Sequence, residues 1–306
     1  MTAAHAPAGP FGRLPVPPTV EVVALSVPVG LLTALHARPV GAERGVVLFV
    51  PGFTGSKEDF LDFLPLARAE GWDAWAYSQR GQADSVAPAG TANYTLDAFA
   101  GDLVAVATLV GNGRPVHLVG HSFGGVVARA AAIASPALFA DVTLLCSGPY
   151  GWAGRNSKNA ALVRRHGSAA WWDRDNPGLV GRPDEELTVD QAFTRLRMAR
   201  TSDDNLLGAA GILADTTDTT AELGATGLPV LVAHGVDDEA WPQDWQRQMA
   251  ARLHAPYVVI PGAAHSPQRE NPAATAALLD DFWGRRAAAS VPDPADTPDP
   301  ADTPDR

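Results

Sequence analysis

Short apolar runs alternate with longer amphipathic stretches along most of this chain, and this alternation constrains the fold more than any other feature of the sequence. Eight short apolar runs are predicted to be strands: 20–27, 31–37, 45–50, 74–77, 116–119, 142–146, 229–233 and 257–260. The amphipathic stretches that separate or follow them are predicted to be helices: 57–70, 96–110, 123–135, 244–253 and 272–282. Such alternation indicates an α/β fold with a mostly parallel eight-stranded sheet and helices on both faces. The first two strands have no helix between them and are expected to form an antiparallel hairpin at one edge.

The alternation lapses after residue 147 and resumes at residue 227. This segment contains helix-like pieces at 159–166, 184–200 and 205–215, and a structureless loop of that length is improbable. We therefore expect a helical cap at 148–226, inserted into a core formed by 20–147 and 227–288. Residues 1–19 form an N-terminal extension, and the repeated Pro-Asp-Pro-Ala-Asp-Thr unit predicts a disordered acidic tail at 289–306.

Composition limits the class of partner. The formal net charge of -11 disfavours nucleic acid and anionic membranes, which are bound chiefly through Lys and Arg, so a small-molecule substrate is expected. Cys146 is the only cysteine, which excludes an intramolecular disulfide. No signal sequence and no apolar stretch of membrane-spanning length are recognised, so the protein is expected to be cytoplasmic. The oligomeric state cannot be read from these features.

The strongest local motif is the sequence Gly-His-Ser-Phe-Gly at residues 120–124, which directly follows an apolar strand and precedes a helix rich in small residues. This context is what a nucleophile elbow requires, because the glycines allow a tight turn that presents Ser122 at the start of a helix. A serine hydroxyl needs a base to take its proton, and the base needs an acid to orient it. His265 follows the last strand, and Asp237 and Asp238 follow the strand before it.

The order and context of these motifs resemble the α/β-hydrolase superfamily over about residues 20–286. In that family the acid commonly lies three residues after the glycine that ends the strand, which assigns the role to Asp238, with Asp237 as the alternative. The resemblance also implies an oxyanion hole formed by the amides of Phe53 and Phe123. Here Pro51 replaces the family's histidine, which removes a side chain that usually braces this loop. The segment 78–85 is similar to the family's Asp-x-Arg-Gly-x-Gly-x-Ser turn, with Ser78 and Ala83 as departures, and is expected to support the fold.

A serine nucleophile implies acyl transfer to water through an acyl-serine intermediate, and it excludes the alkyl-enzyme route of the family's dehalogenases and epoxide hydrolases, which use aspartate. We expect an ester-cleaving enzyme of the carboxylesterase or lipase type. A thioesterase, a lactonase, a C–C hydrolase, a cofactor-free perhydrolase or haloperoxidase, and a receptor-like binding module with weak turnover remain alternatives. No metal-ligand motif is present, so neither a metal nor another cofactor is expected.

The pocket is expected to hold the apolar acyl or alcohol part of the substrate. The candidate substrate-binding residues are apolar and belong to the cap or to the loop after Asp238: Trp171, Trp172, Leu206, Leu207 and Trp241. Ordinary packing inside the cap is an alternative role for these side chains. On one predicted cap helix Arg195, Arg197 and Arg200 could meet a substrate carboxylate, whereas a solvated face paired with residues 184–186 is favoured.

Overall fold

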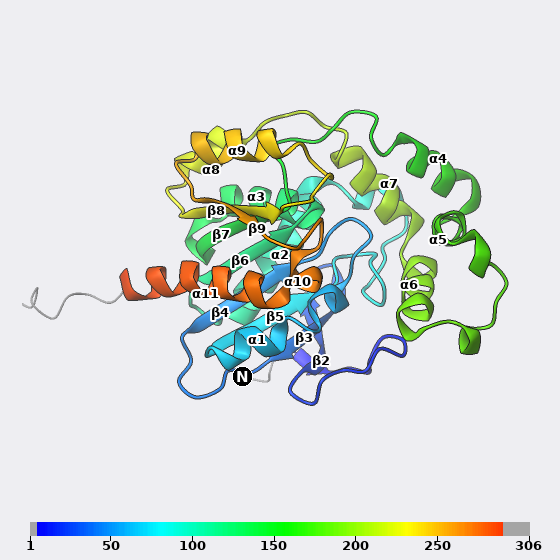
Figure 1. Cartoon of the computed structure of the whole chain (residues 1–306), viewed down its shortest axis with the longest axis horizontal. Coiled ribbons are helices and arrows are strands. Elements are labelled where there is room, and N and C mark those ends of the chain that lie inside the picture. The colour runs from blue at the N-terminus through cyan, green and yellow to red at the C-terminus, as the bar shows by residue number, and fades with distance from the viewer. Residues whose placement is uncertain (1–4, 290–306) are drawn as a thin grey trace, which may run out of the picture.

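The computed structural model describes residues 5–289, and the sheet at its centre is mostly parallel (Figure 1). The strands are β1 (His5–Pro7), β2 (Glu21–Val27), β3 (Gly30–Ala37), β4 (Gly45–Val50), β5 (Trp72–Tyr77), β6 (Val116–His121), β7 (Phe139–Leu145), β8 (Val230–Gly235) and β9 (Tyr257–Ile260). Their order in the sheet is β1-β2-β3-β5-β4-β6-β7-β8-β9. The strands from β5 to β9 in this order run parallel, whereas β1, β2 and β3 add antiparallel pairs at one end. The α/β class and the mostly parallel sheet are as predicted. Of the tail predicted at 289–306, Ala289 is the last residue of a helix, and 290–306 lie outside the described residues.

The prediction of eight strands was one too low. The additional strand, β1, lies in the segment assigned to the N-terminal extension and pairs antiparallel with β2, so that His5 faces Leu25 and Pro7 faces Val23. Its sequence, His-Ala-Pro, is neither apolar nor β-branched, and the strand exists because its backbone bonds to the open side of β2. The predicted hairpin of β2 and β3 is therefore present, but β1 occupies the edge beyond it.

The helices that cover the sheet, with their short 3-10 turns, lie on both of its faces (Figure 1). They are η1 (Lys57–Phe60), α1 (Leu64–Ala69), η2 (Thr91–Asn93), α2 (Leu96–Gly111), α3 (Phe123–Ala134), η3 (Pro136–Leu138), α8 (Thr220–Ala225), α9 (Gln243–Arg252), α10 (Pro267–Glu270) and α11 (Pro272–Ala289). The single helix predicted at 57–70 is divided into η1 and α1, because Pro65 lacks the N–H that a continuous helix would need and instead occupies the first turn of α1.

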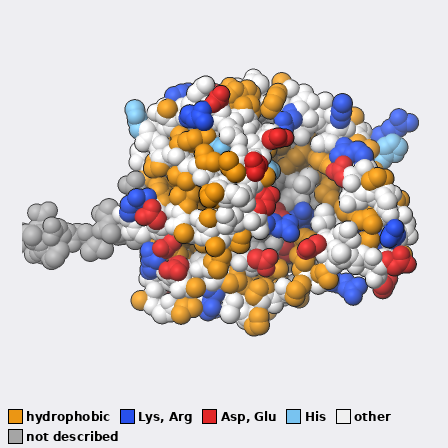
Figure 2. Space-filling view, viewed as in Figure 1, with side chains coloured by type: hydrophobic (Ala, Val, Ile, Leu, Met, Phe, Trp, Pro, Cys, Tyr) orange, Lys and Arg blue, Asp and Glu red, His pale blue; other side chains and the backbone are white. Residues whose placement is uncertain are grey.

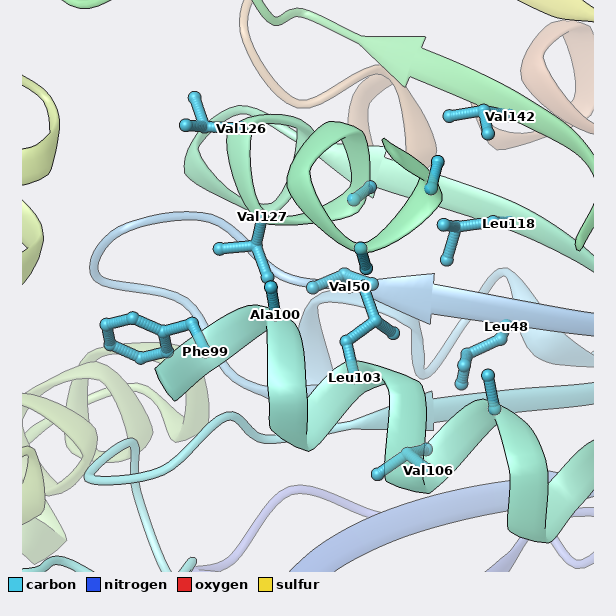
Figure 3. Close-up of a cluster of buried hydrophobic side chains, with 14 of the residues drawn as sticks. Leu48, Val50, Phe99, Ala100, Leu103, Val106, Leu118, Val126, Val127 and Val142 are labelled. Carbon is cyan, nitrogen blue, oxygen red and sulfur yellow. The ribbon is translucent and has the colours of Figure 1, made fainter. Parts of the chain in front are cut away.

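Strand β4 shows how the two faces form two cores. Val46, Leu48 and Val50 belong to a cluster with α2, α3 and α9, and Figure 3 shows Leu48 and Val50 beside Leu103 of α2. The alternate residues Val47 and Phe49 belong to a second cluster with α1 and α11. Successive side chains of a strand point to opposite faces, so a central strand covered on both sides must be apolar at every position.

The segment between β7 and β8 contains helices and no strand within the part of the chain that the structure describes. We call residues 148–226 the helical insertion. Its elements are α4 (Ser157–His166), α5 (Ala169–Asp175), η4 (Pro177–Leu179), η5 (Asp184–Glu186), α6 (Val189–Arg200), α7 (Asp203–Ile212) and α8. Helices α4 to α7 extend away from the sheet in Figure 1 and enclose their own small core, whereas α8 packs against α3 and α9. None of the helices within residues 5–289 combines the length and apolar character required to cross a membrane.

Candidate active site

Ser122 occupies the sharp turn between β6 and α3. Its backbone has φ 57° and ψ -119°, a strained conformation for a residue with a side chain. Two backbone hydrogen bonds hold this turn: the Ser122 amide donates to the Leu145 carbonyl at 2.9 Å, and the Gly125 amide donates to the Ser122 carbonyl at 2.9 Å. The geometry is that of a nucleophile elbow, in which surrounding structure fixes a serine at the carboxyl end of a central strand.

The glycines on either side of Ser122 are required by close backbone contacts. A Cβ atom at Gly120 would lie 2.5 Å from the Gly124 carbonyl oxygen, and one at Gly124 would lie 2.2 Å from the Val50 carbonyl oxygen. No side chain fits at either distance without movement of the backbone. The missing side chains therefore let the elbow pack directly against the loop that follows β4.

Three residues that are distant in the sequence meet at the elbow. His265 Nε2 lies 2.9 Å from Ser122 Oγ, and His265 Nδ1 lies 2.8 Å from Asp238 Oδ1. Burial raises the pKa of Asp238, but the hydrogen bond and charge of His265, together with the bonds from Ala240 and Gln246, outweigh burial and leave the pKa below its ordinary value. Asp238 is therefore a carboxylate that accepts from Nδ1–H, which leaves Nε2 free to accept the Ser122 proton. Asp238 is buried, whereas Asp237 is exposed to solvent.

The loop that carries His265 is held from two sides. His121 Nε2 donates to the His265 carbonyl at 2.6 Å. On the other side, the Glu270 carboxylate at the end of α10 accepts from the amides of Ala264 at 2.5 Å and Ser266 at 3.3 Å. The role of Glu270 was not identified from the sequence, because nothing in the local pattern distinguishes it from a surface glutamate. These contacts position His265 without touching the reacting atoms.

His121 makes stability dependent on pH. Burial, followed by repulsion from His265, lowers the pKa of His121 from 6.5 to about 4. The unfolded chain therefore binds a proton at His121 at higher pH than the folded chain does. The contribution of this difference to the free energy of unfolding is complete above pH 6.5 and is lost as the pH falls towards 4. At about 1.4 kcal/mol for each pKa unit, the full contribution is about 3 kcal/mol. Urea denaturation at pH 7.5 and 4.5 should show a smaller loss of stability for His121→Gln than for the wild type, and equal losses would contradict this role.

The loop after β4 brings the Phe53 amide towards the elbow. The amides of Phe53 and Phe123 donate to no other residue within the described chain, as expected of groups kept free for an oxyanion. A Cβ atom at Gly52, next to Phe53, would lie 3.3 Å from the Ser122 Cβ. The loop is thus close enough to the nucleophile for both amides to face one developing charge.

Two buried glutamines brace this loop. Gln79 Nε2 donates to the Pro51 carbonyl at 3.0 Å, and Gln82 Nε2 donates to the Gly52 carbonyl at 2.8 Å. The Gln82 Oε1 atom also accepts from the Gln79 amide at 3.0 Å. The turn at 78–85, interpreted from the sequence as support for the fold, therefore also holds the candidate oxyanion loop, where Pro51 provides no bracing side chain.

Substitution of Gln82 by leucine should weaken catalysis more than substrate binding. The change keeps the size of the side chain but leaves the buried Gly52 carbonyl without its donor, which costs about 1–3 kcal/mol of stability. A loosened oxyanion donor should lower kcat roughly tenfold, part of the effect of losing a donor entirely. Steady-state kinetics and urea denaturation measure the two effects. The exposed Gln248→Leu variant is the control, and an unchanged kcat in Gln82→Leu would contradict the bracing role.

A pocket with a cavity volume of about 290 Å³ opens above Ser122 and His265. Its apolar wall is formed by Phe53, Trp152, Trp171, Leu213 and Trp241. Of the candidate substrate-binding residues, Trp171 and Trp241 are on this wall. The side chains of Trp172, Leu206 and Leu207 instead pack in the small core of the helical insertion, and none of them lines the pocket. An apolar side chain on a helix of the insertion can face either the pocket or the small core, and the sequence did not distinguish the two directions.

The polar side of the same pocket includes Asp59, Arg155, Arg197 and Arg269. Of the three arginines considered on α6, only Arg197 is buried and lines the pocket, whereas Arg195 is paired with Asp184. Figure 2 shows a hollow between the surface over the sheet and the surface over the helical insertion, with charged side chains of both signs at its edge.

Within residues 5–289 one group of metal-ligating side chains comes close together: one donor atom each of His121, Cys146 and His265, within 4.8 Å of one another. Both ring nitrogens of His265 already face Ser122 and Asp238, and His121 Nε2 bonds a carbonyl. Burial raises the pKa of the Cys146 thiol well above its ordinary value, so the residue remains a thiol. The nitrogens of His265 are thus committed to other contacts, whereas His121 Nδ1 has no hydrogen-bond partner among the described residues, and the expectation of no metal stays a prediction.

Comparison with known proteins identifies a match in sequence and in structure. The model of an alpha/beta hydrolase family matches residues 47–278. A Variovorax paradoxus protein, provisionally named carbamate hydrolase RutD, is 29% identical over 279 residues, which cover 84% of this chain and 99% of that protein.

Solved structures show the same fold. A structure from a study of carboxylesterases of Nitrososphaera gargenis has a TM-score of 0.70 and 18% identity, and the match covers 87% of this chain and 99% of that one. The enol-lactonase of Burkholderia xenovorans has a TM-score of 0.69 and 21% identity, over 85% of this chain and 99% of that one. At 18% and 21% identity, the similarity to these structures shows a shared fold and no more.

Proposed function

This chain belongs to the alpha/beta hydrolase family, and we propose that it is a serine hydrolase that cleaves an ester-like acyl bond through an acyl-serine intermediate. The observation that carries the proposal is the continuous line of contacts from Ser122 Oγ through His265 to the buried Asp238, with distances of 2.9 and 2.8 Å. This arrangement contains a nucleophile, a base and an acid in the roles that acyl transfer requires.

The reaction begins with attack by Ser122 Oγ on the substrate carbonyl as His265 Nε2 takes the hydroxyl proton. The negative charge on the carbonyl oxygen is stabilised by the amides of Phe53 and Phe123, each worth about 3 kcal/mol of barrier in comparable sites. His265 then gives its proton to the leaving group, and the acyl group remains on Ser122. Water, activated by the same nitrogen, releases the acid and restores the serine.

The helical insertion acts in this proposal as a cap that forms part of the substrate pocket. Trp171 of α5 stands edge-on to Phe53 at a centroid distance of 5.5 Å, so one aromatic side chain from the insertion and one from the oxyanion loop form a continuous apolar surface. A cavity of about 290 Å³ lies at the small end of ligand sites. A small-molecule substrate with a short apolar acyl or alcohol part fits this space.

A second candidate is hydrolysis of a carbamate or another C–N acyl bond. The observation that favours it is the Variovorax relative, whose provisional name assigns it to carbamates and which this chain matches over almost its full length. The same attack by Ser122 would serve, and His265 would protonate a nitrogen leaving group in place of an oxygen.

The experiment that tests the proposal is hydrolysis of p-nitrophenyl esters of increasing acyl length, with the p-nitroanilides of the same acyl groups assayed in parallel, because cleavage of an anilide breaks a C–N bond. We expect turnover to be highest for short acyl chains, because long chains exceed the cavity. Ester turnover with no anilide turnover supports the first candidate, and the opposite result supports the second. Absence of turnover on both, together with no reaction of Ser122 with a fluorophosphonate, would contradict the proposal.

A further inference from the structure

The pocket above Ser122 differs in charge from the rest of the protein. The chain has a formal net charge of -11. The pocket is nevertheless lined by the guanidinium groups of Arg155, Arg197 and Arg269, and its lining contains a single carboxylate, Asp59. An excess of positive charge beside a candidate nucleophile, in an otherwise acidic protein, indicates that the pocket receives an anionic group.

Arg197 is the arginine held most firmly in this pocket. It lies on α6, is only 8% exposed, and donates through Nη1 to Asp59 Oδ1 at 2.7 Å. Arg269 Nη1 lies 4.0 Å from the same oxygen, so two guanidinium groups share one carboxylate. Asp59 balances only one of these two positive charges, so a carboxylate from a bound molecule would balance the other.

The remaining donors of Arg197 are unused. Nη1 is the only one of its nitrogens that has an acceptor among residues 5–289, and Nε is buried without a partner. Leaving N–H groups of a buried cation unpaired is costly, and such groups in a native structure call for an explanation. Nη2 is the donor left for a further group in the pocket, because Nε is fully buried and beyond the reach of a ligand.

We propose that the substrate carries a carboxylate, and that Arg197 binds this group through donors not used by Asp59 while the scissile carbonyl lies at Ser122. The inference rests on the function proposed above. Arg269, which is half-exposed, faces the same region from the core side of the pocket. Arg155 is exposed, donates to the Glu239 carbonyl and stacks on Trp152, so it lies at the rim.

A carboxylate fits these donors better than a neutral polar group. The guanidinium is planar and permanently charged, and its parallel N–H groups match the two oxygens of a carboxylate. The apolar surface of Phe53 and Trp171 leaves room for the uncharged part of the same molecule. The substrate class is therefore a small ester with an apolar part and one carboxylate.

The test compares matched substrates with and without the charge, on each side of the ester bond. Mono-p-nitrophenyl glutarate is compared with p-nitrophenyl valerate, and 4-acetoxybenzoate is compared with phenyl acetate. Wild type is expected to prefer the charged member of at least one pair by roughly tenfold or more in kcat/KM, the effect of a charge-assisted hydrogen bond. Arg197→Gln should lower kcat/KM for that substrate on the order of 10- to 100-fold, chiefly through KM, and leave the neutral partner within about threefold.

Arg195→Gln is the matched control, because Arg195 lies on the same helix, outside the pocket lining, and pairs with Asp184. If Arg197 only ties the helical insertion to the core through Asp59, Arg197→Gln will reduce both members of each pair equally, and the inference is wrong. Arg269→Gln, which leaves the bond between Arg197 and Asp59 in place, should also reduce the preference. A wild type that cleaves neutral esters with no preference for charge overturns the inference alone, whereas a wild type that neither cleaves nor labels overturns the proposed function with it.

Discussion

Substitution of Ser122 by alanine should lower kcat by about 10⁴- to 10⁶-fold, the effect seen when the nucleophile of a comparable triad is removed. The variant retains His265, Asp238 and the free amides, so a trace of activity can persist without a covalent intermediate. The loss should appear in kcat for every ester that the wild type cleaves. The fold should be unaffected, because the only hydrogen bond of the Ser122 side chain within the described residues is the one to His265.

The matched control for this variant is Ser135→Ala, at the other end of α3, whose side chain has no hydrogen bond within the described residues. It should retain activity within about twofold. Thermal unfolding of both variants shows whether either change disturbs the fold. If Ser122→Ala remains folded and retains more than about a tenth of wild-type activity, the nucleophile lies elsewhere and the mechanism is wrong.

Substitution of Asp238 by asparagine should lower kcat by about 10⁴-fold, as in a triad where the same change leaves the geometry intact. Asparagine preserves the shape but removes the negative charge that stabilises protonated His265, and its amide group favours the wrong histidine tautomer. The pKa of the buried Asp238 carboxylate lies below its ordinary value, so the group is charged throughout the neutral range.

The variant Asp237→Asn tests which of the two neighbouring carboxylates serves as the acid. Asp237 is exposed, and the structure gives it no contact with His265, so this variant should retain activity within about threefold. Measurement of kcat for both variants with one ester decides between them. Equal losses, or a larger loss in Asp237→Asn, would contradict the assignment of the acid to Asp238.

Much of the fold was predictable because its signals are local. A strand covered on both faces must be apolar, and the run that became β4 was predicted with the bounds that the structure shows. The bounds of β9 were also predicted correctly, although this edge strand is only partly buried. The glycines around Ser122 form a short motif that is recognisable in the sequence, although the backbone that a Cβ at Gly124 would meet belongs to β4 and the loop after it. Strand β1 was missed because backbone pairing, and not its side chains, determines it.

Features of the site that depend on tertiary contacts were not predictable. Gln79, Gln82 and Glu270 look like solvent-facing residues in the sequence, yet each bonds a backbone group of the loop that carries Phe53 or of the loop that carries His265. The direction of side chains in the helical insertion is a similar case. Trp172 is buried in the small core, whereas its neighbour Trp171 packs only partly against that core and also lines the pocket, because adjacent residues on a helix point in different directions.

The central claim is that Ser122 is an activated nucleophile, and the most direct measurement is covalent labelling of the wild-type protein by a fluorophosphonate, followed by mass spectrometry of the intact protein and its peptides. The account predicts one label per chain on the peptide that contains Ser122, and markedly slower labelling in Asp238→Asn. A folded wild-type protein that takes up no label, or that is labelled at another residue, would contradict it.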